Sequence, residues 1–168
     1  SKLSHIHLVS NIEAKNRLIQ MGEIDSSVFN IGSPDLDLMN SDKLPTLEHV
    51  KSYYNIDFEK YAILMFHPVT TEVGKLKDQV NILTESLLLS GKNYIVIYPN
   101  NDLGSNLIFN EYNKFKNIDN FLMFPSLWFE YFLVLLKNSE FIIGNSSAGI
   151  REAPYYHIPT INLGNRQN

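Results

Sequence analysis

The sequence lacks cysteine, an excess of basic residues and any long apolar run. Without cysteine there is no disulfide framework and no thiol chemistry. No apolar stretch reaches the roughly 20 residues of a membrane-spanning helix. The net charge of −4 argues against a nucleic-acid-binding protein, which would carry a basic patch. No signal peptide opens the chain at Ser1, so we expect a cytoplasmic protein without membrane or nucleic-acid partners.

The 168 residues have the size of one domain with a core large enough to fold alone. Short apolar runs, typical of strands, alternate with amphipathic or capped helical stretches. Strands are predicted at 5–10, 28–31, 61–66, 94–98, 121–124, 141–143 and 160–163, and helices at 12–21, 35–39, 47–54, 76–89, 105–115, 127–137 and 148–156. This alternation predicts an α/β domain, a three-layer Rossmann-like fold with a parallel sheet.

The stretch 141–167 has the most site-like sequence, FIIGNSSAGIREAPYYHIPTINLGNRQ. A helix that starts after its first strand would present unpaired N–H groups, which suit phosphate. Ser146 and Ser147 add hydroxyl donors, and Gly144 and Gly149 would let a ligand approach the backbone. An ordinary serine-capped turn explains the same residues equally well.

Two charged residues extend this pattern. Glu152 could accept hydrogen bonds from sugar hydroxyls, and Arg166 could pair with a phosphate oxygen. Alternatively, both are solvated surface charges.

Polar side chains directly follow several predicted strands, where ligands bind in parallel α/β sheets. They are His67, Asn100, the 125–126 loop, Ser146, Ser147 and Arg166. His67 is the candidate for acid–base chemistry or a phosphate contact, although a lone histidine is more often structural. The other histidines lack metal-ligand spacing, so we expect no metal site. The residues alone indicate a nucleotide or phosphate-sugar site and give no reaction.

Four motifs, taken together and in order, resemble the UDP-N-acetylglucosamine 2-epimerase family. They are HPVTTE at 67–72, YPNND-G at 98–104, GNSSAGIREAP at 144–154 and INLGNRQ at 161–167, and GSPDLD at 32–37 matches the family's interdomain region. HPVTTE resembles the hydrolysing branch, which converts UDP-N-acetylglucosamine to N-acetylmannosamine and UDP on the route to sialic acids. The resemblance implies anti-elimination of UDP to a 2-acetamidoglucal, followed by addition of water.

The resemblance also implies two Rossmann-like domains, as in B-type glycosyltransferases, with residues 1–168 forming the C-terminal, UDP-binding half. The N-terminal domain and its acidic residues, which move the C2 proton, would lie outside this chain, so the chain alone is expected to be inactive. We expect no cofactor, and a homodimer for the full-length enzyme.

Individual roles carry over from the same resemblance. His67 would contact the pyrophosphate and assist departure of UDP. Glu152 would bind the ribose, Arg166 a phosphate, and the backbone near Leu127 would face uracil. The other residues expected to hold UDP are Asn100, Ser146 and Ser147. The alternatives are a 2-epimerase of a GDP- or UDP-linked diacetamido sugar, a glycosyltransferase donor-binding domain, and a non-catalytic α/β binding module.

Overall fold

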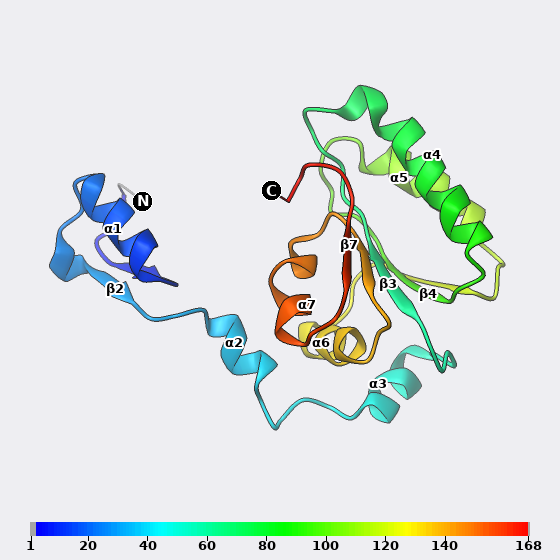
Figure 1. Cartoon of the computed structure of the whole chain (residues 1–168), viewed down its shortest axis with the longest axis horizontal. Coiled ribbons are helices and arrows are strands. Elements are labelled where there is room, and N and C mark those ends of the chain that lie inside the picture. The colour runs from blue at the N-terminus through cyan, green and yellow to red at the C-terminus, as the bar shows by residue number, and fades with distance from the viewer. Residues whose placement is uncertain (1–2, 168) are drawn as a thin grey trace. The chain divides into compact units, whose positions relative to one another are not determined.

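The structure is a computed structural model that describes residues 3–167 (Figure 1). The chain divides into two compact units, Ser1–Leu44 and Pro45–Asn168. Each unit has its own parallel sheet. The assignment of residues 1–168 to a single nucleotide-binding domain remains a prediction.

The first unit is a small strand–helix–strand motif. β1 (His7–Val9) pairs in parallel with β2 (Val28–Asn30), and α1 (Ile12–Gln20) connects them. Asn11 caps α1 as expected, because its side chain accepts a hydrogen bond from the Ala14 N–H. A short helix, α2 (Pro34–Met39), follows. These two strands form a sheet of their own, which the alternation of strands and helices could not reveal because it does not specify pairing.

The second unit contains a five-stranded parallel sheet in the order β5-β4-β3-β6-β7. The strands are β3 (Ala62–Met65), β4 (Tyr94–Ile97), β5 (Phe121–Phe124), β6 (Ile142–Gly144) and β7 (Thr160–Asn162). β3 is central and almost entirely buried, as expected for a continuous apolar run covered on both faces. The chain leaves β3 toward β4 and later returns on its other side at β6. The strand order therefore reverses between β3 and β6, where open α/β sheets bind their ligands.

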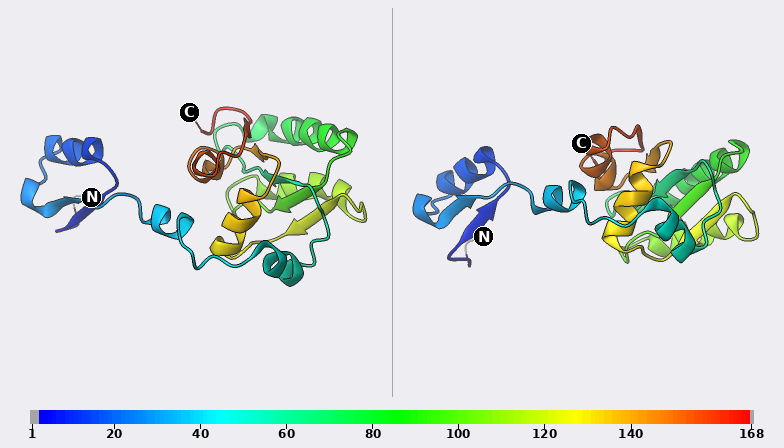
Figure 2. Two further views of the ribbon diagram at one scale, coloured as in Figure 1. Left: turned by 60° about the horizontal axis from the view of Figure 1, so that its bottom comes forward. Right: turned by 90° about the horizontal axis from the view of Figure 1, so that it is seen from below.

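Helices cover both faces of this sheet (Figures 1 and 2). On one face, α4 (Val73–Leu89) packs against α5 (Ser105–Tyr112). The other face is covered by α6 (Phe129–Lys137) and α7 (Glu152–Tyr155). There α3 (Leu47–Tyr54) packs against α6. α4 buries Leu76, Val80, Leu83 and Leu87 along one side. The predicted three-layer Rossmann-like architecture is confirmed.

The last predicted helix, at 148–156, is wrong in its start and its continuity. The structure has a 3-10 turn, η3 (Ser147–Gly149), and then the four-residue helix α7. Pro154 has no N–H and is tolerated only in the first turn of a helix, so α7 begins no earlier than Glu152. The turn after β6 therefore does not open a long helix, and the expected help of a helix dipole to a phosphate is lost.

Candidate functional site

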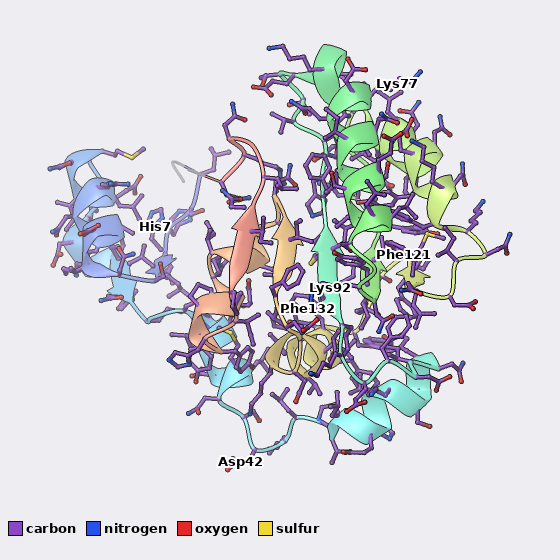
Figure 3. The ribbon with its side chains drawn as sticks, turned by 45° about the vertical axis from the view of Figure 1, so that its right-hand side comes forward. His7, Asp42, Lys77, Lys92, Phe121 and Phe132 are labelled. Carbon is purple, nitrogen blue, oxygen red and sulfur yellow. The ribbon has the colours of Figure 1, made fainter. Side chains whose placement is uncertain are left out.

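A cavity of about 420 Å³ lies at the carboxyl ends of β3, β4, β5 and β6. Its size and mostly apolar lining suit a small ligand. Phe132, which Figure 3 shows on α6, contributes to the apolar wall together with Leu127 and Phe129. The cavity occupies the edge of the sheet at which the strand order reverses, as ligand sites in this architecture do.

The cavity brings together most of the residues singled out in the sequence. His67, Asn100, Leu127, Ser147 and Glu152 all line it. Ser146 and Arg166 do not belong to its lining, although they lie in the segments that follow β6 and β7. The expected convergence at one edge is present, and the ligand contacts of the individual residues stay predictions.

His67 follows β3 after one intervening residue, the buried Phe66, and is itself half-buried. Its Nδ1 accepts a hydrogen bond from the backbone N–H of Asn100, at 3.2 Å, so the proton of the neutral ring lies on Nε2. Burial lowers the pKa of His67 below its ordinary value, and the positive charge of Arg166 lowers it further, against the opposing carboxylate of Asp102. His67 is therefore mostly a neutral N–H donor at neutral pH.

Asn100 has a structural function that sequence reasoning did not assign. Its backbone N–H orients the His67 ring, and its side-chain amide donates to the carboxylate of Asp102. The segment after β4 thereby fixes the histidine at the cavity wall.

Asn145, which the sequence analysis did not single out, is 1% exposed and forms hydrogen bonds with the backbone of His67. Its Oδ1 accepts from the His67 N–H at 2.7 Å, and its Nδ2 donates to the His67 carbonyl at 2.8 Å. Its own backbone carbonyl accepts from Nη1 of Arg166 at 2.9 Å and from Nε2 of Gln167 at 3.2 Å. These partners are distant in sequence, so no local pattern could have identified them.

Gly144 and Gly149 both lie where the backbone closely approaches a neighbouring segment. Gly144 has φ +140°, and a Cβ added there would lie 1.9 Å from the Met65 carbonyl oxygen. A Cβ at Gly149 would lie 2.7 Å from Cγ2 of Thr160 on β7. The close approach of β6 to β3 and of η3 to β7 therefore disfavours any larger residue at these two positions, and the expectation that they admit a ligand to the backbone stays a prediction.

Ser146, Ser147 and Glu152 have different surroundings. Oγ of Ser146 accepts from the Ala148 N–H at 3.3 Å and so caps η3, as one reading of the sequence proposed. Ser147 is exposed at the cavity wall. Glu152 is only 7% exposed and lines the same cavity, where its carboxylate can accept hydrogen bonds from hydroxyl groups.

The loop after β5 is held by an aromatic cluster between α3 and α6. The Trp128 N–H donates to the Tyr54 hydroxyl at 3.1 Å. The Tyr54 ring packs edge-on against Phe124 and Tyr131, with centroids 5.2 and 5.9 Å away. The cluster fixes the loop that carries Leu127, and it does not form a platform of parallel rings for bases.

Within residues 3–167, no helix combines the length and apolar character needed to cross a membrane. The same residues contain no group of three or more histidine, aspartate or glutamate side chains arranged to hold a metal ion.

A family model and two curated relatives all match this chain over nearly its whole length. The chain matches the family model of UDP-N-acetylglucosamine 2-epimerase over residues 1–168. A curated relative, the UDP-N-acetylglucosamine 2-epimerase of Neisseria meningitidis serogroup B, is 55% identical over 168 residues, which are 100% of this chain and 44% of the relative. The GDP/UDP-N,N'-diacetylbacillosamine 2-epimerase (hydrolyzing) of Campylobacter jejuni is 35% identical, over 99% of this chain and 44% of that protein.

Among solved structures, Methanocaldococcus jannaschii UDP-GlcNAc 2-epimerase in complex with UDP-GlcNAc and UDP superposes with a TM-score of 0.71. The two are 23% identical, and the match covers 96% of this chain and 46% of that one. This likeness supports the fold. The chain spans less than half the length of the proteins it matches.

Proposed function

Because the chain belongs to the UDP-N-acetylglucosamine 2-epimerase family, we propose that it forms the nucleotide-binding part of a hydrolysing sugar-nucleotide 2-epimerase. The proposed reaction converts UDP-N-acetylglucosamine and water to N-acetylmannosamine and UDP. The HPVTTE motif at 67–72 and a relative that is named as a hydrolysing 2-epimerase support this branch. The observation that carries the proposal is the cavity at the reversal of strand order, with His67 and Glu152 in its wall.

The proposed ligand fits the chemistry of the cavity. A diphosphate needs donors and positive charge. At the cavity wall Nε2–H of His67 and the hydroxyl of Ser147 would donate, and the guanidinium of Arg166, which lies outside the lining, would add positive charge from the segment after β7. The carboxylate of Glu152 would accept hydrogen bonds from the ribose hydroxyls. The fixed backbone at Leu127 would face the uracil edge.

In the proposed reaction, a base outside this chain removes the proton at C2. The C2–H electrons form the C1=C2 double bond, and the electrons of the C1–O bond leave with UDP. His67 would stabilise the negative charge that develops on the leaving diphosphate, by donating a hydrogen bond or a proton. Water then adds its hydroxyl to C1 and its proton to C2 of the glycal, with inverted stereochemistry at C2.

We further propose that residues 1–168 are the C-terminal half of a longer, cytoplasmic, homodimeric enzyme of sialic acid synthesis. The relatives are more than twice as long as this chain. In the first unit α1 buries no residue, and Leu8 and Phe29 of the two strands are 63% and 49% exposed. Such surfaces suit packing against a further domain. Without the residues that move the C2 proton, this chain alone should not turn over substrate.

The test is to incubate the full-length protein with UDP-N-acetylglucosamine and to identify the products. Release of both UDP and N-acetylmannosamine without an acceptor is the expected result. Accumulation of UDP-N-acetylmannosamine would instead assign the non-hydrolysing reaction. Turnover only with an acceptor would assign a glycosyltransferase. Turnover only of a GDP- or UDP-linked diacetamido sugar would identify that sugar nucleotide as the substrate instead. This last alternative is motivated by the 35% identical Campylobacter jejuni relative, which is named for a GDP/UDP-linked diacetamido sugar.

Arg166→Ala is expected to weaken UDP binding by about 1–3 kcal/mol, because a charge-assisted hydrogen bond to a phosphate is lost. Calorimetric titration of the full-length protein measures this change. Arg17→Ala removes the same charge from an exposed position in α1 and serves as the matched control. An equal UDP affinity in the Arg166 variant and in the wild type would remove Arg166 from the phosphate site.

A further inference from the structure

Asn145 interrupts the hydrogen-bond ladder between β3 and β6. In this parallel pair the Ile63 N–H donates to the Phe141 carbonyl at 3.0 Å, and the Asn145 N–H donates to the Met65 carbonyl at 3.1 Å. The next bond of a regular parallel ladder would join the His67 N–H to the backbone carbonyl of Asn145. That N–H instead donates to the side-chain Oδ1 of Asn145, at 2.7 Å. The side chain therefore replaces its own backbone carbonyl in the ladder.

This replacement has two consequences. The backbone carbonyl of Asn145 is released from the ladder and accepts from Arg166 and Gln167, which follow β7. In addition, Nδ2 of Asn145 donates to the His67 carbonyl at 2.8 Å, so both backbone polar groups of the histidine bond to one amide. Gly144, with φ +140°, turns the chain directly before this residue. One buried residue, through its side chain and its backbone carbonyl, thus joins the segments that follow three neighbouring strands.

We propose that Asn145 is a positioning residue, which fixes His67 and Arg166 relative to each other so that both can act on the diphosphate. The Asn145 amide holds the His67 backbone, and the Asn100 N–H orients the ring at Nδ1. The released carbonyl holds the guanidinium of Arg166 at 2.9 Å. This proposal rests on the proposed function, because it assigns these two residues to the leaving group.

The structure predicts what a substitution at this position does. In Asn145→Ala the His67 N–H loses its side-chain acceptor and competes with Arg166 for the backbone carbonyl of residue 145. In Asn145→Asp the shape and the acceptor remain, but a carboxylate oxygen replaces Nδ2 and faces the His67 carbonyl, so the donor is lost and two acceptors repel. Both changes displace His67 without touching the ligand directly.

The experiment is a double-mutant cycle between Asn145→Ala and His67→Ala in the full-length enzyme. The asparagine variant should lower kcat at least about tenfold. In the His67→Ala background the same change should lower kcat by less than about twofold, because the group that it positions is already absent. If Asn145 only stabilises the fold, its loss costs the same in both backgrounds, and the proposal is wrong.

A second readout follows the His67 imidazole by NMR titration in the ligand-free protein. Its pKa should rise toward the ordinary value in both Asn145 variants, since the ring moves away from Arg166 and toward solvent. An unchanged titration would overturn the proposal. Because alanine at a buried position can prevent folding, Asn145→Asp is subjected to the same cycle and the same titration.

Asn93→Ala is the matched control. Its Nδ2 donates to the Lys60 carbonyl at 2.9 Å, so it forms the same kind of bond between the segments of β3 and β4, at the opposite edge of the sheet. It should leave kcat and the His67 titration unchanged. An inactive wild-type enzyme would refute the proposed function. The positioning role alone would be refuted if the wild type is active, His67→Ala is impaired and Asn145→Ala is unaffected.

Discussion

Gly144→Ala is expected to destabilise the second unit by roughly 3–5 kcal/mol, because two costs combine at this position. The φ of +140° is unfavourable for any residue with a Cβ. The added Cβ would also lie 1.9 Å from the carbonyl oxygen of Met65, in the centre of the sheet. That oxygen is backbone and accepts the Asn145 N–H, so it cannot move without breaking the ladder. Denaturant unfolding of the variant measures the loss as a change in the free energy of unfolding.

Two other glycines separate the two costs. Gly74 lies in α4 with nothing within 4 Å of an added Cβ, so Gly74→Ala should be neutral or stabilise by up to about 1 kcal/mol. Gly91 has φ +64° and equally open surroundings, so Gly91→Ala should cost only the backbone strain, about 1 kcal/mol. If Gly144→Ala is no worse than Gly91→Ala, the close approach of β6 to β3 is not as tight as described.

His67→Ala should lower kcat of the full-length enzyme at least about tenfold, as loss of an acid or hydrogen-bond donor to a leaving group does. The effect on kcat should exceed the effect on KM, because the charge on the leaving diphosphate grows in the transition state. His5→Ala, at an exposed position of the first unit, provides the control. Unchanged turnover in the His67 variant would remove this residue from the mechanism.

The low pKa of His67 also predicts a pH dependence of UDP binding. In the free protein, burial and Arg166 favour the neutral ring. The negative diphosphate favours the charged ring, so the pKa is higher in the complex and UDP affinity rises as the pH falls from about 7.5 to about 6. The terminal phosphate of UDP titrates in the same range. The quantity to compare is therefore the slope of UDP affinity against pH in the wild type and in His67→Gln. Equal slopes would contradict a contact between His67 and the diphosphate.

The low pKa of His67 has the opposite effect on folding stability, which decreases as the pH falls. Because the folded-state pKa of His67 lies below the ordinary 6.5, the unfolded chain binds the proton more readily. This residue therefore reduces stability as the pH falls below about 6.5, and it has no effect above that range.

Elements with strong local signals could be predicted from the sequence. α3 occupies Leu47–Tyr54 as expected, with Thr46 as its cap, and β3 lies within the predicted apolar run. The polar residues after the predicted strands were expected to meet at one edge of the sheet, and His67, Asn100 and Ser147 do line one cavity there, whereas Ser146 and Arg166 do not. These successes depend on periodicity, caps and the geometry of parallel sheets, all of which are readable within short windows.

Features that depend on distant partners could not be predicted. The pairing of β1 with β2 in a separate sheet, and the bonds of Asn145 to His67 and Arg166, join residues far apart in the chain. The break before α7 is a different case, because Pro154 is a local signal in the sequence that disfavours a continuous helix over 148–156.

We propose that the cavity of the second unit binds a uridine nucleotide. Calorimetric titration of the full-length protein with UDP, with GDP as the matched nucleotide, tests this assignment. We predict selective binding of UDP, weakened by Arg166→Ala and unchanged by Arg17→Ala. Equal or tighter binding of GDP would contradict the uridine assignment while keeping the site, and binding of neither nucleotide would contradict the nucleotide site itself.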